Sequence, residues 1–223
     1  MSWDVAIIGG GVVGTAIARE LAGYQVRCVL LEAAGDVGTG TSKANTAILH
    51  TGFDATPGTL ESRLVARGST LLRAYAERAG IAVERTGALL VAWSPEQAGS
   101  LDAIAAKSGA NGYTRLRSVS VSEVYGREPN LGPGVAGGLW IPDEWVIDPW
   151  SVPLAYATEA VRAGVDLLLR TRVTGVSVLP GGEGFELAVG PGADPVRCRF
   201  AVNAAGLASD EVDRMFIVTP RKK

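Results

Sequence analysis

The sequence predicts an α/β fold that opens with a strand, a glycine-rich turn, a helix and a second strand. The apolar run Val5–Ile8 has the length of a buried strand and leads directly into the turn Gly9–Gly14. Apolar residues at helical spacing follow, and the second apolar run, Arg27–Leu31, ends at the acidic residue Glu32. Elements in this order predict one βαβ unit.

The glycines of this turn suit the binding of a dinucleotide. Gly9 allows a tight turn out of the strand, Gly11 lets a pyrophosphate approach the backbone, and Gly14 lets the helix pack closely on the sheet. The helix start offers free N–H groups and the positive end of its dipole to phosphates. Glu32 is placed to accept both hydroxyls of an adenosine ribose, and its charge disfavours NADP. We therefore predict a dinucleotide site, with a plain strand-to-helix turn as the alternative.

Composition limits the class of protein. The 223 residues, 47% of them hydrophobic, are enough for one large domain or two small ones with a buried core. A net charge of −2 argues against nucleic-acid binding, and the basic end Arg221–Lys223 is expected to be solvated. Cys28 and Cys198 lack a CxxC or histidine-rich neighbourhood, which predicts two buried thiols in a reducing cytosol and no metal site. No leader or membrane-spanning stretch is recognised, so we expect a cytoplasmic protein, and peripheral membrane attachment remains open.

The next elements carry the chain away from the second strand. The first helix is expected to end near Gly23, and the polar stretch Gly35–Asn45 is a candidate lip of the cofactor site because it follows the second strand directly. Thr56–Pro57 is predicted to open another helix. Its apolar face is predicted to comprise Leu64, Gly68, Leu71, Leu72, Tyr75 and Ala79. Its arginines, Arg63, Arg67, Arg73 and Arg78, are predicted to be solvated.

Residues 83–145 carry no second glycine fingerprint, and we interpret them as an inserted domain that faces the substrate. The predicted elements are the strands Gly87–Trp93 and Gly137–Ile141, a short strand near Arg115, and the helices Ser94–Ser108 and Ser120–Arg127. Asp143 and Glu144, beside Trp145, either line the mouth of a substrate site or belong to a surface loop.

The last third returns to a strand-rich pattern. Asp148–Pro149 is predicted to cap a helix, and Val165–Leu169 follows as a core strand. Three further runs predict an antiparallel meander with glycine- and proline-containing turns: Val173–Leu179, Phe185–Val189 and Val196–Phe200. Ala201–Gly206 resumes the buried pattern, a helix starts at Ser209, and Phe216–Val218 is strand-like.

Taken together, these motifs resemble a known family. They are the Gly9–Gly14 fingerprint with Ala18 and Leu21 behind it, Glu32, the segments GTSKANTAILHTGFDATPGTL and WVIDPWSVPLAYATEAVRAGV, and the late VNAAG. The chain resembles FAD-dependent oxidoreductases of the D-amino-acid oxidase superfamily over nearly all of its length. Within them it is most similar to the glycerol-3-phosphate dehydrogenase-like branch, with L-2-hydroxyglutarate oxidase as a near neighbour.

The resemblance implies a fold and a set of cofactor contacts. The fold is a discontinuous, Rossmann-like FAD-binding domain, residues 1–82 and 146–223, with an inserted, mostly antiparallel substrate domain, residues 83–145. Family members run well past this length, so the chain is expected to be truncated relative to them. Carried over by position, the FAD-binding residues are Gly9, Gly11, Val12, Val13, Gly14, Glu32, Ala33, Thr41, Ser42, Asn45, Thr46, Val173, Ala205 and Gly206.

The resemblance also implies a reaction, the transfer of a hydride from a carbon that bears a hydroxyl or amine to the flavin. His50, the one histidine of the sequence, is the candidate base for the hydroxyl proton. A core histidine, a residue that tunes the flavin and a covalent flavin link are the alternatives. Lys43 is expected to hold an anionic substrate or stabilise the reduced flavin, with an exposed lysine as the alternative.

The substrate and the electron acceptor are less sharply defined. Glycerol 3-phosphate is the first expectation, but Asp54 stands near the place where some relatives use an arginine for the phosphate. A carboxylate there would repel that phosphate. A 2-hydroxy acid such as L-2-hydroxyglutarate, or an amino acid, is the alternative substrate. The acceptor is a quinone, oxygen or a partner protein. A rival of another class is an inactive flavin-fold module that binds partner proteins.

Overall fold

The computed structural model describes residues 2–190 and 192–216, so Pro191, the end of the strand-like run Phe216–Val218 and the basic end Arg221–Lys223 lie outside the described residues. The chain divides into two compact units. The first comprises residues 1–45 and 149–223, and the second comprises residues 46–148. Residues 46–82 and 146–148, which the sequence analysis assigned to the FAD-binding domain, fall in the second unit, where strand β3 (Ile48–Leu49) pairs with strand β8 (Trp145–Ile147).

The first unit is built on one six-stranded sheet of order β10-β11-β12-β1-β2-β9. In chain order its strands are β1 Ser2–Ile8, β2 Cys28–Leu31, β9 Asp166–Leu168, β10 Val173–Val178, β11 Phe185–Val189 and β12 Val196–Asn203. Strands β12, β1, β2 and β9 are parallel, which confirms the predicted βαβ unit. Strands β10, β11 and β12 are antiparallel, which confirms the predicted meander.

Strand β12 connects the two halves of this sheet. The sequence analysis ended a strand at Phe200 and treated the next residues separately, but β12 continues to Asn203. It pairs antiparallel with β11 around Val196–Cys198 and parallel with β1 as far as Asn203. The continuous partner on the β1 side keeps the strand extended where its other neighbour has ended.

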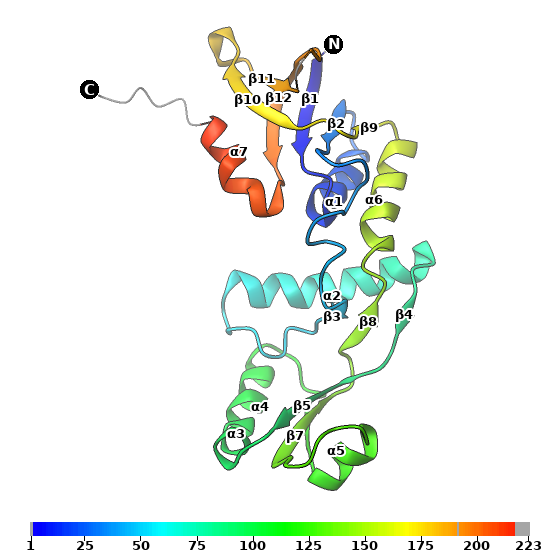
Figure 1. The fold of residues 1–223 in the computed structure, drawn as a ribbon, viewed down its shortest axis with the longest axis vertical. Coiled ribbons are helices and arrows are strands. Elements are labelled where there is room, and N and C mark those ends of the chain that lie inside the picture. The colour runs from blue at the N-terminus through cyan, green and yellow to red at the C-terminus, as the bar shows by residue number, and fades with distance from the viewer. Residues whose placement is uncertain (1, 191, 217–223) are drawn as a thin grey trace, which may run out of the picture. The chain divides into compact units, whose positions relative to one another are not determined.

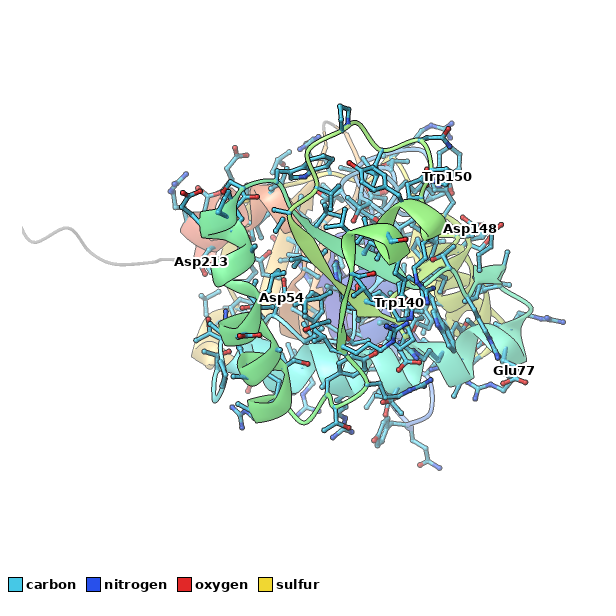
Figure 2. The ribbon with its side chains drawn as sticks, turned by 90° about the horizontal axis from the view of Figure 1, so that it is seen from below. Asp54, Glu77, Trp140, Asp148, Trp150 and Asp213 are labelled. Atoms are coloured by element: carbon cyan, nitrogen blue, oxygen red, sulfur yellow. The ribbon has the colours of Figure 1, made fainter. Side chains whose placement is uncertain are left out.

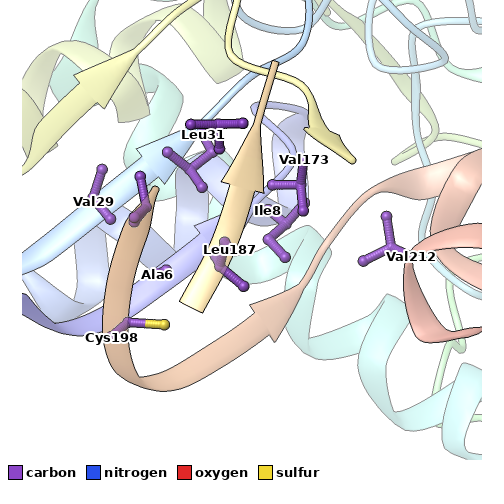
Figure 3. Close-up of a cluster of buried hydrophobic side chains, with 10 residues drawn as sticks. Ala6, Ile8, Val29, Leu31, Val173, Leu187, Cys198 and Val212 are labelled. Atoms are coloured by element: carbon purple, nitrogen blue, oxygen red, sulfur yellow. The ribbon is translucent and has the colours of Figure 1, made fainter. Parts of the chain in front are cut away.

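Helices cover both faces of the sheet. Helices α1 (Val12–Leu21) and α6 (Ser151–Arg162) are packed against each other and share a buried cluster with alternate residues of β1 and β2. Helix α7 (Ser209–Phe216) covers the opposite face, where Val212 meets Ile8 and Val173. Figure 3 shows this second cluster. Because β1 and β2 are buried on both faces, they read as continuous apolar runs in the sequence.

Helix α6 begins later than the sequence indicates. The sequence analysis placed the cap at Asp148–Pro149, whereas the helix starts at Ser151 with Trp150 at its N-cap. The backbone N–H of Asp148 donates to the carbonyl of Ala82, 3.0 Å away. Short 3₁₀ turns at Pro180–Gly182 and Gly206–Ala208 complete the first unit.

The second unit contains two antiparallel three-stranded sheets, of order β3-β8-β4 and β5-β7-β6 (Figure 1). Its strands are β3 Ile48–Leu49, β4 Val83–Glu84, β5 Ala88–Ala92, β6 Arg117–Val119, β7 Gly137–Ile141 and β8 Trp145–Ile147. Its helices are α2 Leu60–Ala79, α3 Pro95–Gly99, α4 Leu101–Ala110 and α5 Val121–Arg127.

Helix boundaries in this unit follow side-chain caps. Helix α2 begins at Leu60, not at Thr56–Pro57, because the Thr59 side chain accepts the N–H of Ser62. Ser94 caps α3 as expected, but the predicted helix 94–108 is divided at Ser100 into α3 and α4. The predicted apolar face of α2 holds for Tyr75, which is buried, but not for Leu64 and Leu71, which are exposed.

The glycine turn yields a matched stability test. A Cβ on Gly14 would overlap the carbonyl oxygen of Gly9, whereas Gly68, inside α2, has no atom within 4 Å of its added Cβ. We expect Gly14→Ala to lose about 1–3 kcal/mol of stability or more. Gly68→Ala should gain about 0.5–1 kcal/mol from the lower flexibility of the unfolded helix segment. Urea unfolding followed by circular dichroism measures both, and a Gly14→Ala protein as stable as the wild type would contradict the packing described.

The two thiols yield a reactivity test. Cys28 and Cys198 are free and buried, as predicted. Burial raises the pKa of Cys198 to about 11, and burial followed by the charge of Asp4 raises the pKa of Cys28. Both thiols should therefore stay protonated at pH 8 and react with a disulfide reagent only after denaturation. Because the folded state keeps the Cys198 thiol neutral, its contribution to the free energy of unfolding should decrease as the pH rises from the ordinary thiol pKa toward about 11. Rapid labelling of native Cys198→Ala or Cys28→Ala protein at pH 8 would disprove the burial of the remaining thiol.

Candidate functional site

Close packing requires glycine in the turn between β1 and α1. Gly9 has φ +110°, and a Cβ there would collide with the backbone of Ala204. The chain therefore leaves β1 sharply, and α1 begins at Val12 after the N-cap Gly11. Because the N-cap residue is a glycine, it supplies no capping side chain. The N–H of Val12 instead donates to the Ser42 hydroxyl at 2.9 Å. The amide groups of the helix start thus lie beside the polar lip.

The carboxylate of Glu32 is fixed against the same turn. One oxygen accepts the N–H of Gly10 at 2.6 Å, and the other accepts the N–H of Ala34 at 2.7 Å. Because Glu32 directly follows β2 and the turn directly follows β1, the parallel pairing of the two strands places both at the same sheet edge. The result is a negative group held at the carboxyl ends of the strands.

A pocket of about 420 Å³ opens at this edge within the first unit. It is lined by Gly9, Gly11, Glu32–Ala34, Thr39–Ser42, Arg172 and Ala204–Ala208. Most of the predicted cofactor residues therefore meet there: Gly9, Gly11, Glu32, Ala33, Thr41, Ser42, Ala205 and Gly206. An adjoining pocket of about 200 Å³ adds Val173 and shares Glu32 and Ala205.

The remaining predicted residues do not line the two pockets. Val12 and Val13 are exposed on the first turn of α1, and Gly14 is buried beneath them. The Asn45 amide donates to the carbonyls of Thr41 and Ser42 and so braces the lip. Thr46 is the first residue of the second unit and is exposed.

Arg172 is a lining residue that the sequence analysis missed. It immediately precedes Val173 at the start of β10, so its place at a strand end beside a named residue was a usable signal. It contributes a permanent positive charge to a pocket whose other charged residue is Glu32.

Lys43 is engaged within the first unit. Its ammonium lies 2.9 Å from Asp36 and 5.7 Å from the ring centre of Trp150, and its side chain is only 18% exposed. The hydrogen bond from Lys43 lowers the pKa of the Asp36 carboxyl. The amine is thus partly neutralised by a neighbour, and its role toward flavin or substrate stays a prediction.

The second unit contains a larger pocket of about 750 Å³. Helix α2 and the segments around Tyr113 and Trp145 line it. The guanidinium carbons of Arg73 and Arg85 lie 4.1 and 4.8 Å from the Trp145 ring centre. Arg73 also donates to the carbonyl of Asp143, so the prediction of a solvated arginine was wrong for this residue. Arg73 Nε, Ser69 Oγ and Asn111 Oδ1 are buried without a hydrogen-bond partner.

The two adjacent acids at the end of β7 are buried in the structure, which overturns the surface-loop alternative. Asp143 accepts the Tyr113 hydroxyl at 2.9 Å and an Arg115 N–H at 2.7 Å. The pKa of Tyr113 is raised to about 12, mainly by burial and also by this hydrogen bond to Asp143. Glu144 is directed to another group of residues.

That group contains His50. Nδ1 of His50 lies 3.0 Å from Glu144 Oε2, and the N–H and hydroxyl of Thr51 donate to Glu144 Oε1 at 2.6 and 2.8 Å. The His50 side chain is 54% exposed, whereas that of Glu144 is 3% exposed. The candidate base is therefore held on one side by a buried carboxylate.

Asp54 follows in the same unit. Its backbone carbonyl accepts a hydrogen bond from the Lys107 ammonium on α4 at 3.2 Å, and Figure 2 shows it beside that helix. Asp54 is exposed to solvent.

Comparison with known proteins places the chain in a family. The family model described as "FAD dependent oxidoreductase" matches residues 4–223. The chain belongs to the DAO family of FAD-dependent oxidoreductases. This confirms the resemblance and the fold class predicted from the sequence.

The chain is also similar to individual proteins of known sequence and structure. A glycerol 3-phosphate dehydrogenase of Caloramator mitchellensis is 33% identical over 213 residues, covering 96% of this chain and 44% of the relative. The human mitochondrial L-2-hydroxyglutarate dehydrogenase is 28% identical over 229 residues, covering 98% and 49%. The FAD-bound, dithionite-reduced L-α-glycerophosphate oxidase of Mycoplasma pneumoniae superposes with a TM-score of 0.91 at 27% identity, covering 96% and 57%.

The chain spans about half the length of the curated relatives it matches. Among the described residues, no helix combines the length and apolar character needed to cross a bilayer.

Proposed function

We propose that this chain binds FAD and belongs to a flavoenzyme that oxidises a small hydroxy compound, with glycerol 3-phosphate as the first candidate. The observation that carries the proposal is the pocket at the β1–α1 turn, where Glu32 and the glycine backbone meet. Membership of the DAO family supports the redox class.

The residues of this pocket fit the adenosine and pyrophosphate part of FAD. Gly11 adds no side chain at the helix start, so a phosphate could approach the backbone there and take the place of the Ser42 hydroxyl as acceptor of the Val12 N–H. The Glu32 carboxylate is held at the strand ends, where it would accept ribose hydroxyls. Thr41 and Ser42 would add hydroxyl donors, and Ala33, Val173, Ala205 and Gly206 would supply the apolar wall.

The proposed chemistry divides between cofactor and protein. Bound FAD supplies a hydride acceptor. His50 would take the hydroxyl proton of the substrate, because an imidazole is a base near neutral pH. Lys43 would act through its positive charge toward the substrate or the reduced flavin, competing with its bond to Asp36.

The substrate proposal has one specific rival. The likeness to glycerol 3-phosphate enzymes favours a polyol phosphate. Asp54, exposed four residues after His50, opposes a phosphate, and an L-2-hydroxyglutarate dehydrogenase is also similar over nearly the whole chain. A 2-hydroxy acid is therefore the second candidate. We also propose a quinone, oxygen or a partner protein as the electron acceptor, and a cytoplasmic location, with which peripheral membrane attachment is compatible.

Visible absorption separates the enzyme from an inactive binding module. Flavin bands that bleach anaerobically with substrate support the enzyme. A colourless preparation that FAD does not restore contradicts the proposal.

Glu32 provides the test of the cofactor site. We expect Glu32→Gln to weaken FAD binding roughly 10- to 100-fold, because a charge-assisted hydrogen bond to the ribose is lost and an NH₂ group replaces one of the two oxygens that accept the N–H groups of Gly10 and Ala34. Glu20→Gln, which removes an exposed carboxylate from α1, should leave the affinity unchanged. Flavin fluorescence quenching measures binding, with circular dichroism to verify folding. Equal FAD affinity for Glu32→Gln and wild type would show that Glu32 does not contact the cofactor.

His50 provides the test of the reaction. We expect His50→Gln to slow anaerobic flavin reduction about 10²- to 10⁴-fold, since a general base is lost. Glycerol 3-phosphate and L-2-hydroxyglutarate are compared in parallel by stopped-flow absorption, with an unchanged flavin spectrum as the control. Rates equal to wild type across pH would exclude His50 as the base.

A further inference from the structure

The register of a short sheet places His50 opposite Glu144. Strands β3 and β8 are antiparallel, with Ile48 opposite Val146 and Leu49 opposite Trp145. Continuing this register by one residue brings His50 opposite Glu144. Backbone pairing thus positions the two side chains, although 94 positions of sequence numbering separate them.

The Glu144 carboxylate is buried and is held in place by hydrogen bonds. Its side chain is 3% exposed, and a carboxylate in such a place needs hydrogen bonds to offset the loss of water. Thr51 supplies two of them, both to Oε1. Oε2 is left facing His50 Nδ1 at 3.0 Å. The carboxylate cannot rotate away without breaking the Thr51 bonds.

This arrangement selects one form of the imidazole ring. A neutral histidine carries a single N–H, on Nδ1 or on Nε2, and an ionised carboxylate can only accept. The Glu144 oxygen therefore requires the proton on Nδ1. Nε2, on the far side of a ring that is 54% exposed, keeps its lone pair.

We propose that Glu144 is a positioning residue that holds His50 in the Nδ1–H tautomer and leaves Nε2 free to accept a proton. The function of Nε2 as the base in substrate oxidation rests on the function proposed above. The tautomer and its cause rest only on the geometry of the second unit.

The isosteric variant Glu144→Gln reverses the arrangement instead of merely weakening it. Two Thr51 donors hold the amide oxygen of the glutamine on their side, so its NH₂ group faces His50. Nδ1 must then accept, and the proton moves to Nε2. A base at Nε2 would be lost although the ring keeps its place.

The sequence makes this measurement unusually direct. His50 is the one histidine, so ¹⁵N-histidine labelling of untagged protein gives a single pair of ring nitrogen signals. Long-range ¹H–¹⁵N correlation at a pH where the ring is neutral identifies which nitrogen is protonated. We expect Nδ1–H in the wild type and Nε2–H in Glu144→Gln. Asp143→Asn, which alters the neighbouring buried carboxylate bound to Tyr113 and Arg115, should keep the wild-type pattern.

Two results would overturn the proposal: an Nε2–H ring in the wild type, or the same tautomer in Glu144→Gln as in the wild type. The wild-type spectrum needs no variant, so the test does not depend on the folding of Glu144→Gln.

Reduction kinetics then separate this inference from the proposed function. If both hold, Glu144→Gln slows flavin reduction by about 10²-fold or more, as His50→Gln does, with substrate affinity little changed. If the tautomer reverses but neither substitution slows reduction, the positioning role of Glu144 stands and the base function of His50 is wrong. If His50→Gln slows reduction but the His50 tautomer is the same in Glu144→Gln as in the wild type, His50 is supported as the base and the positioning role of Glu144 is wrong.

Discussion

The close approach of helix α1 to the turn that leaves β1 is the constraint on which the first unit depends. A side chain at Gly14 would occupy the place of the Gly9 carbonyl, so the helix can lie this near the sheet only with hydrogen at that position. The approach brings the start of α1 to the carboxyl ends of β1 and β2. Glu32 then reaches the N–H of Gly10, and the lip residue Ser42 reaches the N–H of Val12. One packing requirement thus assembles the backbone amides, the acid and the hydroxyl of the pocket.

Local patterns predicted the parts of the fold that are set by local physics. The glycine turn, the β7 strand Gly137–Ile141 and the Ser94 cap were readable because backbone freedom, apolar runs and capping side chains act over a few residues. The burial of Asp143 and Glu144 was not readable, since it depends on Thr51 and Arg73, which lie far away in sequence. For the same reason, the solvated face assigned to α2 was wrong at Arg73.

The second unit shows how adjacent acids acquire separate tasks. Asp143 bonds to Tyr113 and Arg115, while Glu144 bonds to Thr51 and pairs with His50. Each carboxylate is therefore satisfied by its own set of donors, as burial requires. The same burial that raises the pKa of Tyr113 makes these bonds costly to break. The polar interior of the unit is thus ordered by two independent networks.

The mixed pairing of β12 bears on the order in which the first unit is made. Strands β10, β11 and β12 are close in sequence and can pair locally as hairpins. Strand β1, in contrast, pairs on one side with residues 197–203, which are far away in sequence. During synthesis, one edge of β1 therefore stays unpaired until residues 197–203 have emerged from the ribosome. An apolar strand with an open edge is prone to intermolecular pairing, so a nascent chain of this design gains from chaperone protection until β12 arrives.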